Sequence, residues 1–202
     1  MRRFLGWASG VGGVLLALGW AVARLRLVPA WEVSVFRWWN GLPDVAAAAL
    51  WAPMQFGSLV GPVVVAAGAV IVTMRARPAV DVLVAGLLGW LVARVIKDVV
   101  DRGRPEAYLV DVAVRGASVD GFGFVSGHTA VAFAVATVLA PDLSPRWRVV
   151  AFVLAACVGA ARMVIGAHFP ADVVGGAGVG LLCGAAARLV IDRVASAVRP
   201  AS

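Results

Sequence analysis

The 202-residue sequence contains little charge, two cysteines, two histidines and one lysine. Charged residues make up 14% of it, against 62% for hydrophobic residues, and the mean hydropathy is +0.93. Soluble globular chains are about 45–50% apolar and about 25% charged, and a small domain cannot bury so much apolar surface. The composition excludes a disordered chain and an ordinary soluble domain. It predicts a single membrane domain over residues 1–202, with the lipid bilayer as its solvent.

The formal charge of +7 is carried almost wholly by arginine. The arginines stand mostly at the ends of apolar stretches, which is typical of membrane topology and of lipid headgroup contact. No basic stripe with interleaved aromatic residues is present, so we expect no nucleic-acid partner. Cys157 and Cys183 lie within apolar runs, and we expect them to be packing residues rather than a disulfide or metal ligands.

The apolar pattern predicts an all-α bundle of six transmembrane helices. The first run resembles a secretory signal peptide, but its length of about 20 residues and the spans after it favour a retained helix. The second is interrupted by Pro53, Gly57 and Pro62, and is either one bent helix or a surface segment followed by a span. The expected spans cover residues 4–23, 46–74, 79–97, 127–140, 147–164 and 171–191.

Residues 28–43 differ from these runs. Tryptophan prefers the membrane interface, and one helical face of this segment is apolar and rich in it. We interpret the segment as a short helix lying on the membrane surface, with an ordinary connecting loop as the alternative. The apolar face consists of Trp31, Val35, Trp38, Trp39 and Leu42, and it is interrupted by Glu32, Arg37 and Asn40.

Six spans would place both termini on one side of the membrane. The positive-inside rule makes that side the cytoplasm. The opposite, extracytoplasmic side would then hold the loop 98–125 and the turn 162–170, which carry nearly all the polar chemistry. The arginines expected on the cytoplasmic side are Arg2, Arg3, Arg75, Arg77, Arg146, Arg148, Arg188, Arg193 and Arg199.

The first polar cluster contains Lys97, Arg104 and Pro105. On one helix Lys97 and Arg104 would share a face two turns apart, with Pro105 ending the helix. A lysine point charge and an arginine fork both suit a phosphate. The alternative is a helix flank with snorkelling side chains, in which the intervening polar residues form four-apart pairs, Lys97 with Asp101 and Asp98 with Arg102.

The second cluster, Ser126-Gly127-His128, directly precedes an apolar helix. Ser126 is placed to N-cap that helix, and Gly127 lets the backbone approach a ligand closely. A helix start offers free N–H groups to a phosphate, and His128 in its first turn is placed to donate a proton. A simple cap with an interfacial histidine is the alternative.

The third cluster contains Arg162, His168 and Asp172. His168 and Asp172 are four residues apart and within reach of each other on a helix. An aspartate on one ring nitrogen leaves the other nitrogen free to attack phosphorus. The only two histidines of the chain, His128 and His168, fall on the same predicted side of the membrane.

In order and spacing these clusters resemble the three signatures of the type 2 phosphatidic acid phosphatase superfamily, which also includes vanadium-dependent haloperoxidases. The signatures are Lys-x6-Arg-Pro, Pro-Ser-Gly-His and Ser-Arg-x5-His-x3-Asp. The resemblance covers about residues 79–190, which would form the catalytic core. Val125 and Ala161 replace the usual proline and serine, which leaves the local loop shape and the fine phosphate contacts open.

The resemblance implies that His168 is a nucleophile that forms a phosphohistidine, with Asp172 orienting it. His128 would be the general acid for the leaving group and then the base for water. No metal or other cofactor is expected, because cations can supply the positive charge that the transition state needs. The groups expected to hold the phosphoryl oxygens are Lys97, Arg104, Arg162, Ser126 and the Gly127 N–H.

The expected function is hydrolysis of a lipid phosphate or diphosphate at the outer membrane face. Polyprenyl (undecaprenyl) diphosphate is the preferred substrate. Phosphatidic acid, phosphatidylglycerol phosphate and a polyprenyl-phosphosugar phosphate stay open, and the oligomeric state is not predicted. A vanadate-dependent halide oxidation and a non-enzymatic transporter or scaffold are the alternatives from other classes.

Three further features carry expectations. Gly176, Gly180 and Gly184 repeat every four residues, which predicts close helix packing. Asp81 lies near a span end, where its side chain is expected to reach the interface. The loop 106–124 is a candidate lid.

Overall fold

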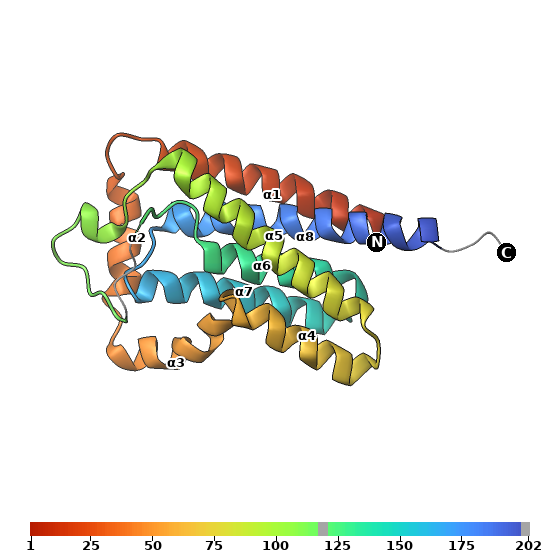
Figure 1. The fold of residues 1–202 in the computed structure, drawn as a ribbon. Coiled ribbons are helices and arrows are strands. Elements are labelled where there is room, and N and C mark those ends of the chain that lie inside the picture. The colour runs from red at the N-terminus through yellow and green to blue at the C-terminus, as the bar shows by residue number, and fades with distance from the viewer. Residues whose placement is uncertain (117–120, 199–202) are drawn as a thin grey trace.

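The computed structural model describes residues 1–116 and 121–198, which form helices and loops and no strand. Figure 1 shows the long helices running side by side around a shorter central helix, α6 (Gly127–Leu139). Nine of the 13 residues of α6 are buried, whereas the outer helices expose many valines, leucines and tryptophans. An apolar exterior of this kind suits lipid, and the all-α prediction is confirmed. The long helices are α1 (Arg2–Ala23), α5 (Arg77–Val100), α7 (Pro145–Val164) and α8 (Pro170–Val198).

Fewer than six helices of the described residues have the length and composition of a membrane span. In length and composition α1, α5, α7 and α8 are able to cross a membrane, and a bent pair would make a fifth span. This pair is α3 (Asp44–Met54) and α4 (Val60–Thr73), joined through the short helix η1 (Gln55–Gly57) and bent by 72°. The 13 residues of α6 extend only about 20 Å, less than a bilayer core of about 30 Å. A sixth span is therefore not confirmed.

Close backbone contacts explain several glycines around α6. At Gly57 a side chain would lie 2.5 Å from the His128 carbonyl oxygen, so the bend between α3 and α4 fits directly against the start of α6. The glycine repeat of α8 lies against α6, where added side chains would collide with backbone oxygens of Ser126, Ala130 and Ala134. The predicted packing role is confirmed for the repeat Gly176, Gly180 and Gly184.

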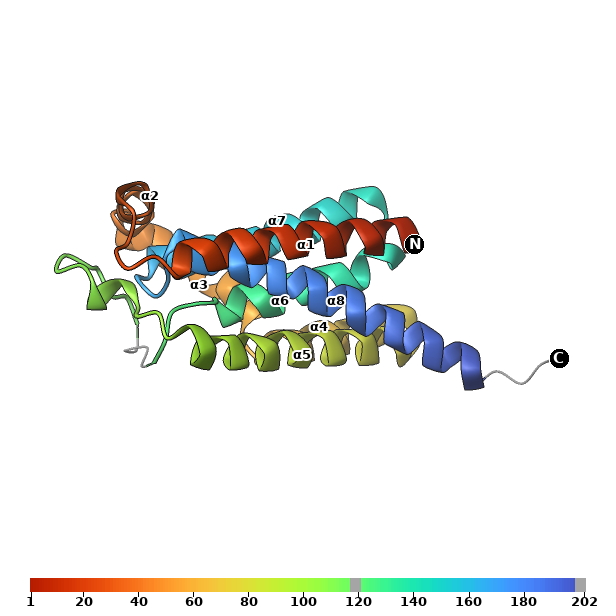
Figure 2. The ribbon, with the colours of Figure 1, turned by 90° about the horizontal axis from the view of Figure 1, so that it is seen from above.

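The two ends of the bundle differ in character. Figures 1 and 2 show the start of α1 and the end of α8 at one end, while α2 (Ala30–Asn40) crosses the other end. The helix expected over residues 28–43 therefore exists, but its packing face is different. Trp31 and Trp38 are 53% and 64% exposed. The buried side chains are Glu32, Phe36 and Asn40, because the two polar ones find partners inside the bundle.

A polar network occupies the end that holds the termini. Arg188 of α8 is buried and pairs with Asp142 and, at 3.5 Å, with Asp81, while Arg77 pairs with Asp192. Asp81 is only 1% exposed, so the expectation that it reaches the interface is wrong. Its charge is met by Arg188 within the bundle.

The charge asymmetry between the two ends is small. The end crossed by α2 also carries exposed arginines, which adjoin α1 and lie on α2. The side of the membrane that each end faces therefore stays a prediction. These arginines are Arg24, Arg26 and Arg37.

Candidate active site

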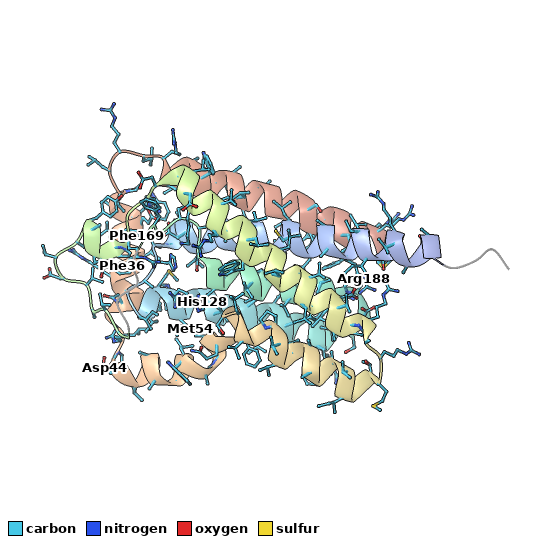
Figure 3. The ribbon with its side chains drawn as sticks, viewed as in Figure 1. Phe36, Asp44, Met54, His128, Phe169 and Arg188 are labelled. Atoms are coloured by element: carbon cyan, nitrogen blue, oxygen red, sulfur yellow. The ribbon has the colours of Figure 1, made fainter. Side chains whose placement is uncertain are left out.

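The three polar clusters of the sequence come together at the end of the bundle crossed by α2. Lys97 lies near the end of α5, His128 in the first turn of α6 and Arg162 in the last turn of α7. His168 lies in the turn 165–169 between α7 and α8, and Asp172 follows in the first turn of α8. Figure 3 shows His128 inside the bundle, at the start of α6.

His168 and Asp172 lie side by side, as their spacing predicts. His168 is 2% exposed, and its Nδ1 lies 3.6 Å from Asp172 Oδ2. This separation exceeds a hydrogen bond, and Nδ1 has no hydrogen-bond partner among the described residues. Asp172 Oδ2 accepts the Phe169 N–H at 2.8 Å. Catalytic hydrogen bonds are often long before substrate binds.

The electrostatic surroundings keep His168 uncharged. Burial lowers its pKa well below the ordinary value of 6.5, and nearby positive charges act in the same direction. The imidazole is therefore neutral at neutral pH, which is the form able to attack phosphorus. In decreasing order of effect, the neighbours that lower the pKa of His168 are Lys97, Arg162, Arg104 and His128.

Lys97 and Arg104 do not share a helix face, so that expectation is wrong. α5 ends at Val100 because Asp101 adopts a left-handed conformation with φ of +52°. Arg104 reaches the site from the loop, where its Nε donates to Gly121 O at 3.1 Å and its Nη1 to Ala167 O at 3.0 Å.

The Lys97 ammonium also contacts the loop backbone. Its Nζ donates to Phe122 O at 2.7 Å and to Gly123 O at 3.0 Å. Among the described residues Lys97 forms no ion pair with Asp101. That pair was expected if this cluster were only a helix flank.

Ser126 occupies the predicted N-cap position of α6, but its side chain does not cap the helix. Its hydroxyl accepts a hydrogen bond from Thr129 Oγ1 at 2.9 Å. Its N–H donates to Asp172 O at 2.9 Å and so ties the start of α6 to the first turn of α8. Beside Gly127 there is open space within 4 Å of the position a Cβ would take, so a ligand can approach this backbone.

Arg162 is a buried cation with unused hydrogen-bonding capacity. It is 5% exposed, and its Nη1 meets the sulfur of Met54 at 3.5 Å. Its Nε has no hydrogen-bond partner among the described residues. A buried donor without a partner destabilises the fold by about 1–3 kcal/mol, so this guanidinium is better placed for an anion than for stability.

A cavity of about 390 Å³ adjoins these cations. Lys97, Arg104 and Gly127 line it, together with Trp90 and Arg94 of α5. The Arg94 guanidinium stacks over the Trp90 ring at 5.5 Å. The cavity therefore joins the cationic site to the exposed face of α5.

Residues 78–195 match the family model described as the PAP2 superfamily. The chain belongs to the PAP2 superfamily. A comparison with curated protein sequences finds no match. The family supports a phosphoric ester hydrolase in a membrane, consistent with a histidine among cations at one end of an apolar bundle.

Two solved structures of PAP2 proteins resemble the chain. LpxE of Aquifex aeolicus is 26% identical with a TM-score of 0.71, covering 81% of this chain and 98% of that one. A transmembrane PAP2-type phosphatidylglycerolphosphate phosphatase of Bacillus subtilis is 22% identical with a TM-score of 0.72. That match covers 96% of this chain and 98% of the other, and it shows the shared fold.

Sequence reasoning missed the contacts of two charged residues with the start of α8. Arg102 was expected to pair with Asp98, but its Nη1 donates to Asp172 Oδ1 at 2.9 Å. Its Nη2 donates to Glu32 Oε2 at 2.6 Å. The signal for Glu32 was its spacing of four and eight residues from Phe36 and Asn40, which places all three on one helical face.

The loop between α5 and α6 is anchored where it is described. Asn40 Nδ2 donates to Ala113 O at 2.9 Å, and Arg115 Nη1 donates to Val164 O at 2.8 Å. Arg115 also pairs with Asp44 at 2.7 Å. Residues 117–120 of the candidate lid 106–124 lie outside the described residues, so the lid stays a hypothesis.

No group of three or more histidine, cysteine, aspartate or glutamate residues is arranged to hold a metal ion within residues 1–116 and 121–198. The positive charge beside His168 is supplied by side chains of the protein.

Val125 and Ala161, the two departures from the signatures, are both fully buried.

Proposed function

We propose that this PAP2 protein removes a phosphate group from a membrane lipid through a phosphohistidine on His168. The observation that carries the proposal is the buried, neutral His168 imidazole surrounded by Lys97, Arg104 and Arg162. Because Nδ1 faces Asp172, Nε2 is the atom that attacks phosphorus. The bond from phosphorus to the leaving oxygen breaks as His128, which takes up a proton when the negative phosphate group enters the site, gives that proton to the leaving oxygen. His128 then takes a proton from water, and the resulting hydroxide displaces His168 from phosphorus.

The three cations stabilise the charge on the phosphoryl oxygens. In phosphoryl transfer the protein acts mainly by positioning and by electrostatic stabilisation. Donors that are already in place need little reorganisation when the transition state forms. Arg162 is such a donor, since its buried Nε has no hydrogen-bond partner among the described residues. We therefore propose that the reaction needs no metal ion.

The lipid nature of the substrate follows from where the site lies. A headgroup reaches the cations at the end of the bundle, while the tail stays beside the apolar face of α5. Arg94, which also lines the cavity, favours a diphosphate, because the second phosphate adds negative charge that a further cation can meet. Polyprenyl diphosphate is our preferred substrate. Phosphatidic acid, phosphatidylglycerol phosphate and polyprenyl-phosphosugar phosphates share the reacting group.

The test is phosphate release in detergent from a panel of these lipids, with and without excess chelator. His168→Ala should abolish release while retaining the wild-type unfolding midpoint. Equal release by wild type and His168→Ala would remove the nucleophile assignment. Loss of wild-type release on adding chelator would overturn the metal-free mechanism.

A further inference from the structure

A buried chain of charges runs behind the nucleophile, from α2 to α8. Arg102 meets Glu32 with two hydrogen bonds, of 3.2 Å and 2.6 Å, and meets Asp172 with one of 2.9 Å. Glu32 and Asp172 are fully buried, and Arg102 is 4% exposed. Glu32 lies outside residues 78–195, the segment that matches the family model.

The charges of Glu32, Arg102 and Asp172 do not cancel. Two carboxylates and one guanidinium leave a net charge of −1, and the Asp172 carboxylate is the one beside His168. Arg102 makes two hydrogen bonds to Glu32 and one to Asp172, so its single positive charge is shared between the two carboxylates. Asp172 therefore keeps a negative charge that acts on the His168 ring.

Glu32 and Arg102 also fix the geometry of the turn that carries His168. Glu32 Oε1 accepts the Ala171 N–H at 2.9 Å, which ties α2 to the start of α8. The Arg102 guanidinium lies over the Phe169 ring at 4.9 Å, and that ring packs against Phe36 at 5.2 Å. Figure 3 shows Phe36 and Phe169 side by side at this end of the bundle. Rings and ion pairs together hold Asp172 in one orientation.

We propose that Glu32 and Arg102 are positioning residues that set the charge and orientation of Asp172, and through it the reactivity of His168. This inference rests on the proposed function, because it assumes that His168 is the nucleophile. Without Glu32, Arg102 would neutralise Asp172. Without Arg102, two carboxylates would be buried beside each other.

The other groups that face His168 come from every element around it. Asp172 of α8 supplies negative charge, while the remaining groups oppose protonation of the imidazole. Removing negative charge from Asp172 should therefore lower the apparent pKa of His168 and make the ring a weaker nucleophile. These opposing groups are Lys97 of α5, Arg104 of the following loop, His128 of α6 and Arg162 of α7.

The experiment compares Glu32→Gln with Asp81→Asn. Each change removes the charge of a buried carboxylate paired with a buried arginine, but Asp81 lies at the opposite end of the bundle. Glu32→Gln should lower kcat about tenfold, comparable with the loss of a residue that orients a metal-bound ligand, and leave KM within about twofold. The acid limb of its pH–rate profile should move down by about one pH unit. Asp81→Asn should retain the wild-type kcat and profile.

Two further variants separate charge from shape. The double variant Glu32→Gln with Arg102→Gln restores the net charge of −1, so its acid limb should return to the wild-type pH. Glu32→Asp keeps the charge but shortens the side chain, so kcat should fall while the acid limb stays in place. Equal shifts in Glu32→Asp and Glu32→Gln, or a folded double variant with the shift of Glu32→Gln, would overturn the proposal.

A readout without turnover distinguishes this inference from the proposed function. The chain has only two histidines, so ¹⁵N-histidine spectra of the full-length protein in detergent follow the His168 ring directly, with His128→Gln to assign it. Glu32→Gln should lower the titration midpoint of His168 even if no lipid is hydrolysed. An unchanged titration midpoint would refute the positioning role of Glu32 and Arg102. Failure of wild type to release phosphate, with the midpoint shifted, would refute only the proposed function.

Discussion

Replacing Arg162 by methionine should affect activity and stability in opposite directions. At about 4 Å and an effective dielectric constant of about 20, one cation stabilises a unit negative charge by about 4 kcal/mol. Loss of one such donor typically lowers kcat by about 10²–10³-fold. We therefore expect Arg162→Met to lose two to three orders of magnitude in kcat.

The stability effect follows from the contacts of Arg162. Among the described residues, its Nη1 forms a hydrogen bond to the Met54 sulfur at 3.5 Å, and its Nε has no hydrogen-bond partner. Removing a buried donor of this kind relieves about 1–3 kcal/mol. For a chain of this size, each kcal/mol gained in the free energy of unfolding raises the melting temperature by about 2–4 °C. Thermal unfolding in detergent measures it.

Arg188→Met is the matched control at the other end of the bundle. Arg188 is also buried, but it pairs with Asp142 and Asp81, so its loss leaves Asp81 buried without its ion-pair partner. We expect a destabilisation of about 3 kcal/mol and an unchanged kcat per folded molecule. If Arg162→Met retains more than a tenth of wild-type kcat, or unfolds at a lower temperature than wild type, the assignment of Arg162 to the phosphate is wrong.

Two further predictions concern the substrate and the membrane. Arg94→Gln should raise the KM for a diphosphate lipid about tenfold, because a charge-assisted hydrogen bond contributes about 1.5–3 kcal/mol. The KM for a monophosphate lipid should stay nearly unchanged. Equal increases in KM for both kinds of lipid in a headgroup panel would contradict the role of Arg94. With Cys157 and Cys183 replaced by serine, Val110→Cys in the site loop should react with a membrane-impermeant thiol reagent in intact cells. Ser144→Cys should react only after lysis, and the reverse pattern would place the site in the cytoplasm.

The sequence predicted the parts of the site that depend on local spacing. His168 and Asp172 stand one helical turn apart, and Ser126, Gly127 and His128 are consecutive at a helix start, so their relation needs little tertiary information. The break after Val100 was missed because it depends on one residue, Asp101, that adopts a left-handed conformation.

Long-range partners were beyond the reach of a single sequence. Arg102 bonds to Glu32 and to Asp172, each 70 residues away along the chain, and no local pattern selects these partners over Asp98. The position of α6 was missed for a related reason. Its apolar run reads the same whether lipid or other helices surround it, and only its shortness indicates a buried central helix.

The hydrogen bonds that Lys97 and Arg104 make to the backbone bear on how tightly a phosphate can be held. Their donors already serve carbonyl oxygens of residues 121–123 and of Ala167. A phosphoryl group that takes up these donors exchanges one set of hydrogen bonds for another, so its net gain in the ground state is small. Charge that develops during the transfer has no such competitor, because carbonyl groups carry only partial charge. The backbone carbonyl groups thus compete with phosphoryl oxygens for these donors and weaken the binding of substrate and of released phosphate. The additional negative charge of the transition state increases its attraction to the same cations.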